Sequence, residues 1–212
     1  MRKIIITIDG PAGSGKGKIS KYISRKWNMN RLDSGIFYRR LAYFIQRNEI
    51  NFSDERSVIK FVKKISYLSS RNNKYLRSEK ISKLSSKIAG IKEVRDFVNK
   101  QQRILVFKNL HKKGYVVDGR DMGSVVFKNA HLKLYIEVNE EIRAKRRHKQ
   151  LIDMGEKSIY PKILKEIKLR DKIDIKRKHS PLVVPKGAFL INNSGTFHLT
   201  IKDINNLISK VI

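Results

Sequence analysis

The chain has 212 residues, contains no cysteine and carries a formal net charge of +29. The lack of cysteine excludes disulfides and thiolate metal sites, and it fits a reducing compartment. No apolar run reaches transmembrane length, and the apolar stretch after Arg2 and Lys3 is too short for a signal peptide. We therefore expect one cytoplasmic domain of α/β size, with no membrane partner.

The positive charge leaves three interpretations open. The basic residues are spread along the chain, which is also rich in Ile and Asn, so a general compositional bias is one interpretation. A site that holds phosphate groups would also need positive charge, and so would a surface that binds nucleic acid. At low salt such a chain should bind RNA non-specifically in all three cases.

The chain opens with a strand, a glycine-rich turn and a helix. The β-branched run Lys3–Ile8 predicts a buried strand, and a helix is expected at 16–27. The turn between them fits the pattern G-x-x-x-x-G-K, so we interpret it as a phosphate-binding loop (P-loop) rather than a chance turn. Its glycines let backbone N–H groups approach an anion, and its lysine reaches the terminal phosphates. The loop comprises Gly10, Pro11, Ala12, Gly13, Ser14, Gly15, Lys16 and Gly17, and Lys18 follows it.

The remaining elements alternate between helices and apolar strands. After a short segment at 31–33, helices are expected at 34–46, 93–112, 140–152, 161–176 and 199–212, and strands at 115–118, 132–138 and 188–192. The least regular region is expected to hold turn-like structure at 48–58, a short strand or helix at 61–70, a turn at Asn72–Asn73 and mixed structure at 74–92. This alternation predicts an α/β fold with a parallel sheet covered on both faces.

A second candidate anion site follows the first helix. Ser34 stands at the start of the next helix as a candidate cap, and Arg39 follows within its first turns. A serine and an arginine near a helix start suit a second phosphate. The alternative is a helix cap with a solvated arginine and no ligand.

The segment Asp118–Gly123 lies where a buried strand ends, at the sheet edge where ligands collect. Asp118 is a candidate to orient Mg²⁺ or its waters. Arg120 stands between two acids in a glycine-rich loop, so it is either a structural ion-pair partner or a phosphate clamp.

Two later helices carry basic residues at helical spacing. The sets are Arg143, Arg146 and Arg147 on one helix, and Arg170, Asp174 and Arg177 on the next. Each set is either a solvated face or a face that binds a ligand. Asp174 could orient the two arginines beside it or accept hydrogen bonds from sugar hydroxyls.

Together these features favour phosphoryl transfer between two phosphorylated substrates. That reaction needs positioning and charge neutralisation and no protein nucleophile. A GTPase would need a guanine-reading N/T-K-x-D run and a suitable Gln, and the sequence offers neither. The histidines show no metal-ligand spacing.

The chain resembles the bacterial cytidylate kinases of the nucleoside monophosphate kinase family. The motifs that carry the resemblance are IDGPAGSGKG, LDSGxxYR, SxxAxxxxVR, VDGRDMGSVVF, RAKRRxxQL, EIKxRD and SPLV. The resemblance implies one three-layer P-loop kinase domain with a central parallel sheet. Its parts would be a core at 1–50 and 93–212, an insertion at 51–92 that binds the nucleoside monophosphate, and a mobile lid with arginines at 145–180.

The resemblance also implies a role for each candidate residue. The P-loop with Lys18 would hold the ATP phosphates, under a lid that carries Arg143, Arg146 and Arg147. The residues implied for the acceptor are Ser34, Arg39 and Arg120 for its phosphate, Ser86, Arg95 and Asp121 for cytosine with Arg177 nearby, and Arg170 and Asp174 for sugar and phosphate. The implied catalytic set is Lys16, Asp118, Arg120 and Arg170. Mg²⁺ would be held through ATP and water near Asp118, with no direct protein ligand.

The implied activity is ATP-dependent phosphorylation of CMP or dCMP in pyrimidine nucleotide metabolism, by a monomer with no specific nucleic-acid partner. A kinase that prefers UMP or accepts several bases is one alternative. A nucleic-acid-binding protein on a kinase-like frame is another, from a different class. The chain departs from the family pattern at Lys18, where Thr is usual, and at Ile173 and Ile175, where arginine is frequent.

Overall fold

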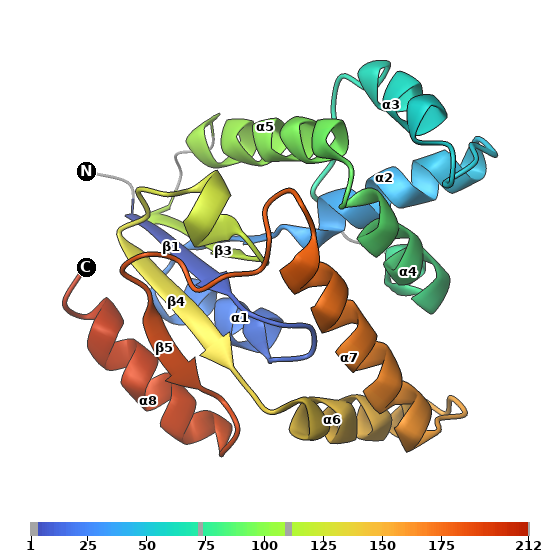
Figure 1. The fold of residues 1–212 in the computed structure, drawn as a ribbon. Helices are drawn as coiled ribbons and strands as arrows, with labels where there is room; N and C mark the ends of the chain where they lie inside the picture. Colours follow the sequence, from blue (N-terminus) through green and yellow to red (C-terminus); the bar gives the residue numbers. More distant parts are fainter. Residues whose placement is uncertain (1–3, 72–73, 109–111, 212) are drawn as a thin grey trace. The chain divides into compact units, whose positions relative to one another are not determined.

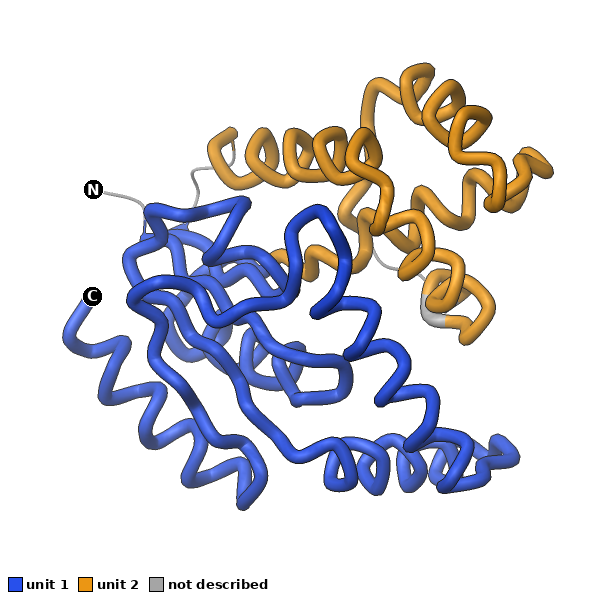
Figure 2. Tube along the Cα trace, viewed as in Figure 1, with its two compact units in different colours: residues 1–31, 112–212 blue, residues 32–111 orange. Residues whose placement is uncertain are grey.

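The computed structural model describes residues 4–71, 74–108 and 112–211 (Figure 1). The chain forms two compact units: unit 1 comprises residues 1–31 and 112–212, and unit 2 comprises residues 32–111 (Figure 2). The expected turn at Asn72–Asn73 lies outside the described residues, as do Lys3 and most of the expected end of the helix 93–112. The segment 51–92 lies wholly within unit 2.

A five-stranded sheet carries the candidate site, with the strand order β2-β3-β1-β4-β5. The strands are β1 (Ile4–Asp9), β2 (Asn30–Asp33), β3 (Gly114–Asp118), β4 (Leu132–Glu137) and β5 (Phe189–Asn192). Strand β1 runs parallel to β3 and to β4, and β4 runs parallel to β5. The predicted α/β fold with a parallel sheet is therefore confirmed. Because Ile8 is in register with Asp118, the acids that end β1 and β3 meet at one edge of the sheet.

One face of the sheet is covered by two helices, α1 (Lys16–Lys26) and α8 (Phe197–Ile208). Ile23 of α1 and Ile204 of α8 share one apolar core with Ile6, Ile8 and Leu134, and all five side chains are fully buried. Strands β1 and β3 read as nearly continuous apolar runs, as interior parallel strands do, whereas buried residues alternate with half-buried or exposed ones in β4. This core fixes the start of α1, and with it the P-loop, above the end of β1.

Two further helices of unit 1 are joined by a short loop and contact each other (Figure 1), α6 (Glu140–Asp153) and α7 (Tyr160–Lys176). The Asn139 side chain caps α6 by accepting the Glu141 backbone N–H at 2.7 Å. The pair has a small core of its own, around Ala144, Ile163 and Ile167. This pair overlaps the segment 145–180 that is expected as a lid.

Unit 2 begins with the last two residues of β2, and its other described regular elements are helical. These helical elements are α2 (Gly35–Arg47), α3 (Glu55–Lys63), the short 3-10 turn η1 (Lys74–Arg77), α4 (Glu79–Ile88) and α5 (Lys92–Lys108). Helix α3 begins inside the segment expected to be turn-like, because the Asp54 side chain accepts the backbone N–H groups of Arg56 and Ser57. Residues 64–70 form neither strand nor helix, since Gln101 bonds the backbone of Ser66 and Leu68.

Two local expectations are wrong. The side chain of Ser34 does not cap α2, because Ser34 itself has helical backbone angles and its hydroxyl makes no capping bond. Instead, Asp33 Oδ1 accepts the Gly35 N–H at 3.0 Å. The glycine-rich loop expected around Arg120 is also partly regular, because a π-helical turn, η2 (Met122–Val126), starts inside the segment 118–123.

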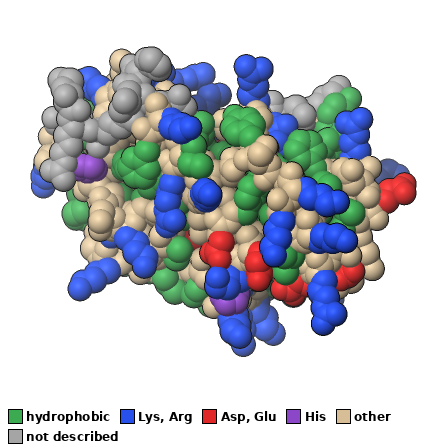
Figure 3. Space-filling model, turned by 90° about the horizontal axis from the view of Figure 1, so that it is seen from above, with side chains coloured by type: hydrophobic (Ala, Val, Ile, Leu, Met, Phe, Trp, Pro, Cys, Tyr) green, Lys and Arg blue, Asp and Glu red, His purple; other side chains and the backbone are tan. Residues whose placement is uncertain are grey.

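The described parts of the chain contain no helix that is long and apolar enough to cross a membrane. Among the same residues, His, Asp and Glu side chains form no group of three that could hold a metal ion. Figure 3 shows one face of the molecule, on which Lys and Arg side chains are scattered among other types and form no single basic patch.

Candidate active site

The P-loop connects the end of β1 to the start of α1. Gly13 and Gly15 have φ angles of +73° and +90°, a left-handed conformation that side chains disfavour. Gly15 is the N-cap of α1. Because a glycine has no side chain to cap the helix, the first backbone N–H groups of α1 are left to face the loop. The local sequence therefore places a glycine-rich turn directly before a helix start, and its use as an anion cradle stays a prediction.

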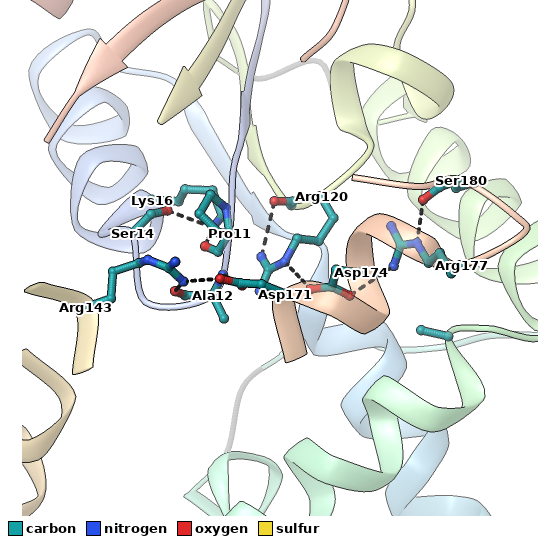
Figure 4. A network of polar contacts seen from close by, with 12 residues as sticks. Pro11, Ala12, Ser14, Lys16, Arg120, Arg143, Asp171, Asp174, Arg177 and Ser180 are labelled. Carbon is teal, nitrogen blue, oxygen red and sulfur yellow. Dashed lines mark hydrogen bonds and ion pairs between the residues drawn. The ribbon is translucent and has the colours of Figure 1, made fainter. Parts of the chain in front are cut away.

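Lys16 lies within this loop, and its side chain is buried (Figure 4). Its ammonium donates to the Pro11 carbonyl at 2.6 Å and to the Ser14 hydroxyl at 3.1 Å. Burial lowers the pKa of Lys16 well below its ordinary value of 10.5, and the Arg120 charge lowers it further, against the opposing effect of nearby acids. A phosphate in the cradle would relieve this cost, because it would give the ammonium an anionic partner.

Arg143 supports the P-loop from α6. Its guanidinium donates to the Ala12 carbonyl at 2.9 Å and to the Val138 carbonyl at 3.0 Å, and it pairs with Asp171 at 2.6 Å. The side chain is almost wholly buried, so protein groups take up its donors. The structure thus places Arg143 beneath the loop backbone, with Asp171 of α7 as its partner.

The other two arginines of α6 have different surroundings. Arg146 donates to the carbonyl of Asn193, in the loop after β5, at 2.8 Å. Arg147 donates to Gln150 on its own helix at 3.0 Å, on the exposed side. The three arginines predicted to share one helix face therefore reach three different sets of partners.

Asp9 ends β1 directly before the P-loop and is fully buried. Its two carboxylate oxygens accept the backbone N–H groups of Met122 and Gly123 at 2.8 and 2.7 Å. Burial raises the pKa of Asp9 to about 6, although these two bonds act in the opposite direction. Asp9 thus joins the P-loop strand to the segment that follows Arg120 and Asp121. Sequence reasoning missed this residue, and its one signal was an acid at the end of an apolar strand.

Asp118 lies at the end of β3 beside the start of α1. Its Oδ2 accepts from the Ser20 hydroxyl at 2.8 Å and from the Arg31 guanidinium at 3.1 Å. The same oxygen is 3.7 Å from the position that a Cβ on Gly17 would occupy, so the carboxylate faces the P-loop helix. A carboxylate here is chemically suited to the waters of Mg²⁺. Sequence reasoning missed Arg31 and Ser20.

Arg120, Asp174 and Arg177 form a chain of ion pairs (Figure 4). Asp174 Oδ2 accepts from Arg120 Nε at 2.9 Å, and its Oδ1 accepts from Arg177 at 3.4 Å. Burial alone would raise the pKa of Asp174, but Arg120, Arg177 and Arg170 together hold it below its ordinary value of 3.8. Of the two roles that the sequence left open for Asp174, the geometry supports the orientation of arginines.

Of the remaining candidates of unit 1, Asp121 and Arg170 lie close to this chain of ion pairs in sequence. Asp121 is buried, and its charge contributes to the raised pKa of Asp9. Arg170 is half-buried, one helical turn before Asp174. Lys18 differs from both, because it is exposed and its ammonium lies 4.0 Å from the centre of the Phe197 ring on α8.

Four candidate residues belong to unit 2. Arg39 on α2 pairs with Asp33 at 3.7 Å, and buried Arg95 on α5 donates to the Ala89 carbonyl at 2.9 Å. The Arg95 guanidinium also lies 5.5 Å from the centre of the Tyr38 ring. Ser34 is buried before α2, and Ser86 is half-buried on α4. Three of these residues therefore lie on the helices α2, α4 and α5, and Ser34 lies directly before α2.

Comparison with known proteins adds an independent finding. A sequence model of the family described as "Cytidylate kinase" matches residues 6–212. A protein named cytidylate kinase from Fusobacterium nucleatum is 39% identical over 100% of this chain and 98% of its own length. One of the same name from Bartonella tribocorum is 36% identical over 92% of this chain and 88% of its own. The crystal structure of TT1252 from Thermus thermophilus covers 100% of both chains with a TM-score of 0.53 at 15% identity, a likeness in fold alone.

Proposed function

The chain belongs to the cytidylate kinase family, and we propose that it transfers the γ-phosphoryl group of ATP to CMP or dCMP. The products are ADP and either CDP or dCDP. The observation that carries this proposal is the polar network of unit 1, in which Lys16 and the P-loop lie beside the ion pairs of Arg120, Asp174 and Arg177 (Figure 4). A donor-phosphate cradle next to an arginine held by Asp174 is an arrangement for two phosphorylated substrates.

The residues of the chain supply position and charge rather than covalent chemistry. The acceptor phosphate is already ionised near neutral pH, so no dedicated general base is needed. In the proposed mechanism, Lys16 exchanges its bonds to Pro11 and Ser14 for the β- and γ-phosphates of ATP. Arg120, held by Asp174, faces the charge that develops on the transferred group.

The donor side is proposed to comprise the P-loop, with Arg143 as a support for its backbone and Arg146 and Arg147 on α6. The acceptor side is proposed to comprise Ser34, Arg39, Arg120, Arg170, Asp174 and Arg177 for phosphate and sugar, and Ser86, Arg95 and Asp121 for the base. Serine and carboxylate groups suit cytosine, because its amino group donates and its ring atoms accept hydrogen bonds.

Mg²⁺ is proposed to enter with ATP. When bound, it supplies charge neutralisation at the phosphates. Asp118 fits a place near the waters of the ion, because its carboxylate faces the start of α1. Its Oδ2 already accepts bonds from Ser20 and Arg31, which fits a neighbour of the ion better than a direct ligand. We further propose that the protein acts as a monomer in the cytoplasm.

An acceptor panel tests the proposal. ADP formation from Mg-ATP is measured with CMP, dCMP, UMP and AMP as acceptors, on a sample whose folding is checked by circular dichroism. Turnover that depends on CMP or dCMP is expected. A preference for UMP would overturn the assignment of Ser86, Arg95 and Asp121 to cytosine. No turnover, together with RNA binding that persists at high salt, would favour the nucleic-acid alternative.

A variant tests the base assignment separately. Asp121→Ala should raise the KM for CMP more than the KM for ATP, because it removes an acceptor proposed for the base. An equal rise for both nucleotides would show that Asp121 acts through the P-loop strand, by way of its neighbour Asp9.

A further inference from the structure

The loop that follows β5 touches the P-loop through one side chain. Asn193 is 4% exposed, and its Nδ2 donates to the Ser14 carbonyl at 2.8 Å. The backbone N–H of Asn193 donates in turn to the Glu137 carbonyl at 2.9 Å, which anchors the residue beside the end of β4. The motifs that carried the functional prediction do not include Asn193.

This bond controls the direction of a peptide group. In a trans peptide, the C=O of one residue and the N–H of the next point to opposite sides. Because Asn193 holds the Ser14 carbonyl on its own side, the Gly15 N–H points away from Asn193. The contact is also tight, since a Cβ on Gly15 would lie 2.5 Å from Asn193 Nδ2. Gly15 has a φ of +90° and no side chain of its own that could hold this peptide.

Thr200 decides which way the Asn193 amide faces. The Thr200 hydroxyl lies 2.9 Å from Asn193 Oδ1 and donates to it, while the Thr196 carbonyl is more distant at 3.3 Å. With the amide oxygen engaged by Thr200, only the NH₂ group is left to face Ser14. Thr200 is 2% exposed, so no water competes for this bond. Arg146 holds the same loop from α6, through the Asn193 carbonyl at 2.8 Å.

We propose that Asn193, oriented by Thr200, is a positioning residue of the donor site that keeps the Gly15 N–H turned into the phosphate cradle. Without this bond the Ser14–Gly15 peptide can rotate, and one donor to the ATP phosphates is lost from the preorganised loop. Asn193 therefore sets the affinity for the donor nucleotide and leaves the affinity for the acceptor unchanged. This inference rests on the proposed function for its use of ATP as donor.

The test compares variants that remove the bond with variants that keep it. Asn193→Leu has nearly the same size and no polar atoms, and Thr200→Val removes only the hydroxyl. Thr200→Ser keeps the hydroxyl. Asn205→Leu is the matched control, because Asn205 of α8 bonds Tyr22 of α1 and Trp27 directly after it, and neither of these bonds reaches the P-loop. Each variant is checked for its melting temperature.

Binding of ATP and ADP to each free protein is measured by calorimetry, beside the KM values for ATP and CMP. For Asn193→Leu we expect a rise of about ten-fold in the dissociation constant and KM of ATP, the worth of about one hydrogen bond. Thr200→Val should show a rise of roughly three-fold or more. Thr200→Ser and Asn205→Leu should bind ATP like the wild type, and the KM for CMP should not change.

Several outcomes would overturn the proposal. The first is a folded Asn193→Leu that binds ATP with wild-type affinity. The second is an equal rise in the KM values for ATP and CMP, and the third is a Thr200→Ser variant that binds ATP as weakly as Thr200→Val. If Asn193→Leu does not fold, the comparison of Thr200→Val with Thr200→Ser decides. Because ATP binding is measured without an acceptor, a failure of the proposed function would appear as absent CMP turnover alone. The two failures can therefore be told apart.

Discussion

Arg31 of β2 donates to the carboxylate of Asp118 on the neighbouring strand β3 at 3.1 Å. Ser20 of α1 bonds both partners, since its hydroxyl accepts from Arg31 Nε at 2.7 Å and donates to Asp118 at 2.8 Å. The three side chains therefore join two strands to the P-loop helix. The Asp118 side chain is 6% exposed, and that of Arg31 is 27% exposed.

Arg31→Leu should destabilise the fold. The change leaves a buried carboxylate with one charged donor fewer, at a cost of about 1–3 kcal/mol in the free energy of unfolding. Urea denaturation at neutral pH measures it. Arg31→Lys should lose less stability than Arg31→Leu, because an ammonium keeps the positive charge. Some loss is still expected, since an ammonium cannot bond Ser20 and Asp118 with the fork geometry of a guanidinium. Unchanged stability in Arg31→Leu would show that the ion pair contributes nothing.

Lys16→Met should separate activity from stability. The rate of phosphoryl transfer should fall by at least about 100-fold, because a preorganised charge at the phosphates is lost. The melting temperature should be equal to that of the wild type or higher, since burial lowers the pKa of Lys16 and the ammonium is costly in the folded state. Lys21→Met, on the exposed side of the same helix, is the control and should change neither quantity. A large drop in melting temperature for Lys16→Met would contradict this account.

Asp9→Asn should alter how stability depends on pH. The pKa of Asp9 is about 6 in the folded protein, against an ordinary value of 3.8 that applies when the chain is unfolded. Between these values the folded state binds the extra proton, so the contribution of Asp9 to stability falls as the pH rises from about 4 to about 6. The stability of the wild type relative to Asp9→Asn should therefore decrease by roughly 1–3 kcal/mol across this window. Urea denaturation at several pH values measures the gap, and a constant gap would refute the assignment.

Asp174→Asn should show the opposite dependence. Because the neighbouring arginines hold the pKa of Asp174 below 3.8, its stabilisation is present above that pH and is lost as the pH falls through the folded-state pKa. The difference in the free energy of unfolding between wild type and variant should thus be largest at neutral pH and should decrease as the pH is lowered. Arg120 also loses its partner at 2.9 Å, so the KM for CMP should rise by about ten-fold. A gap that widens in acid would exclude this role.

Lys18→Thr should leave the activity within a factor of about two, because the exposed Lys18 ammonium lies over the Phe197 ring. The stability should fall by about 0.5–1 kcal/mol, the usual worth of a cation–π contact at an exposed site. A double-mutant cycle with Phe197→Leu checks that the two side chains are coupled. A collapse of activity in Lys18→Thr would mean that Lys18 binds the donor phosphates.

Much of the fold follows from local sequence signals. The runs that form β1 and β3 are apolar and end in an acid, and β1 leads directly into the P-loop. The middle of unit 2 was harder to predict, because α3 and α4 are short and begin at capping side chains such as Asp54. The failure at Ser34 has a similar cause, since Asp33 rather than Ser34 accepts a backbone N–H at the start of α2, that of Gly35.

The sequence by itself determined the phosphate cradle and the family. The order of strand, glycine-rich loop and lysine is contiguous, so its geometry follows from local backbone preferences. Only the tertiary structure decided which side chains hold that cradle and its neighbours in place. Asp9 bonds Gly123, Arg31 pairs with Asp118, and Asn193 reaches Ser14, all between segments far apart in the chain. The physical reason is that a buried polar group must find a partner, and folding, rather than sequence spacing, selects which partner is near.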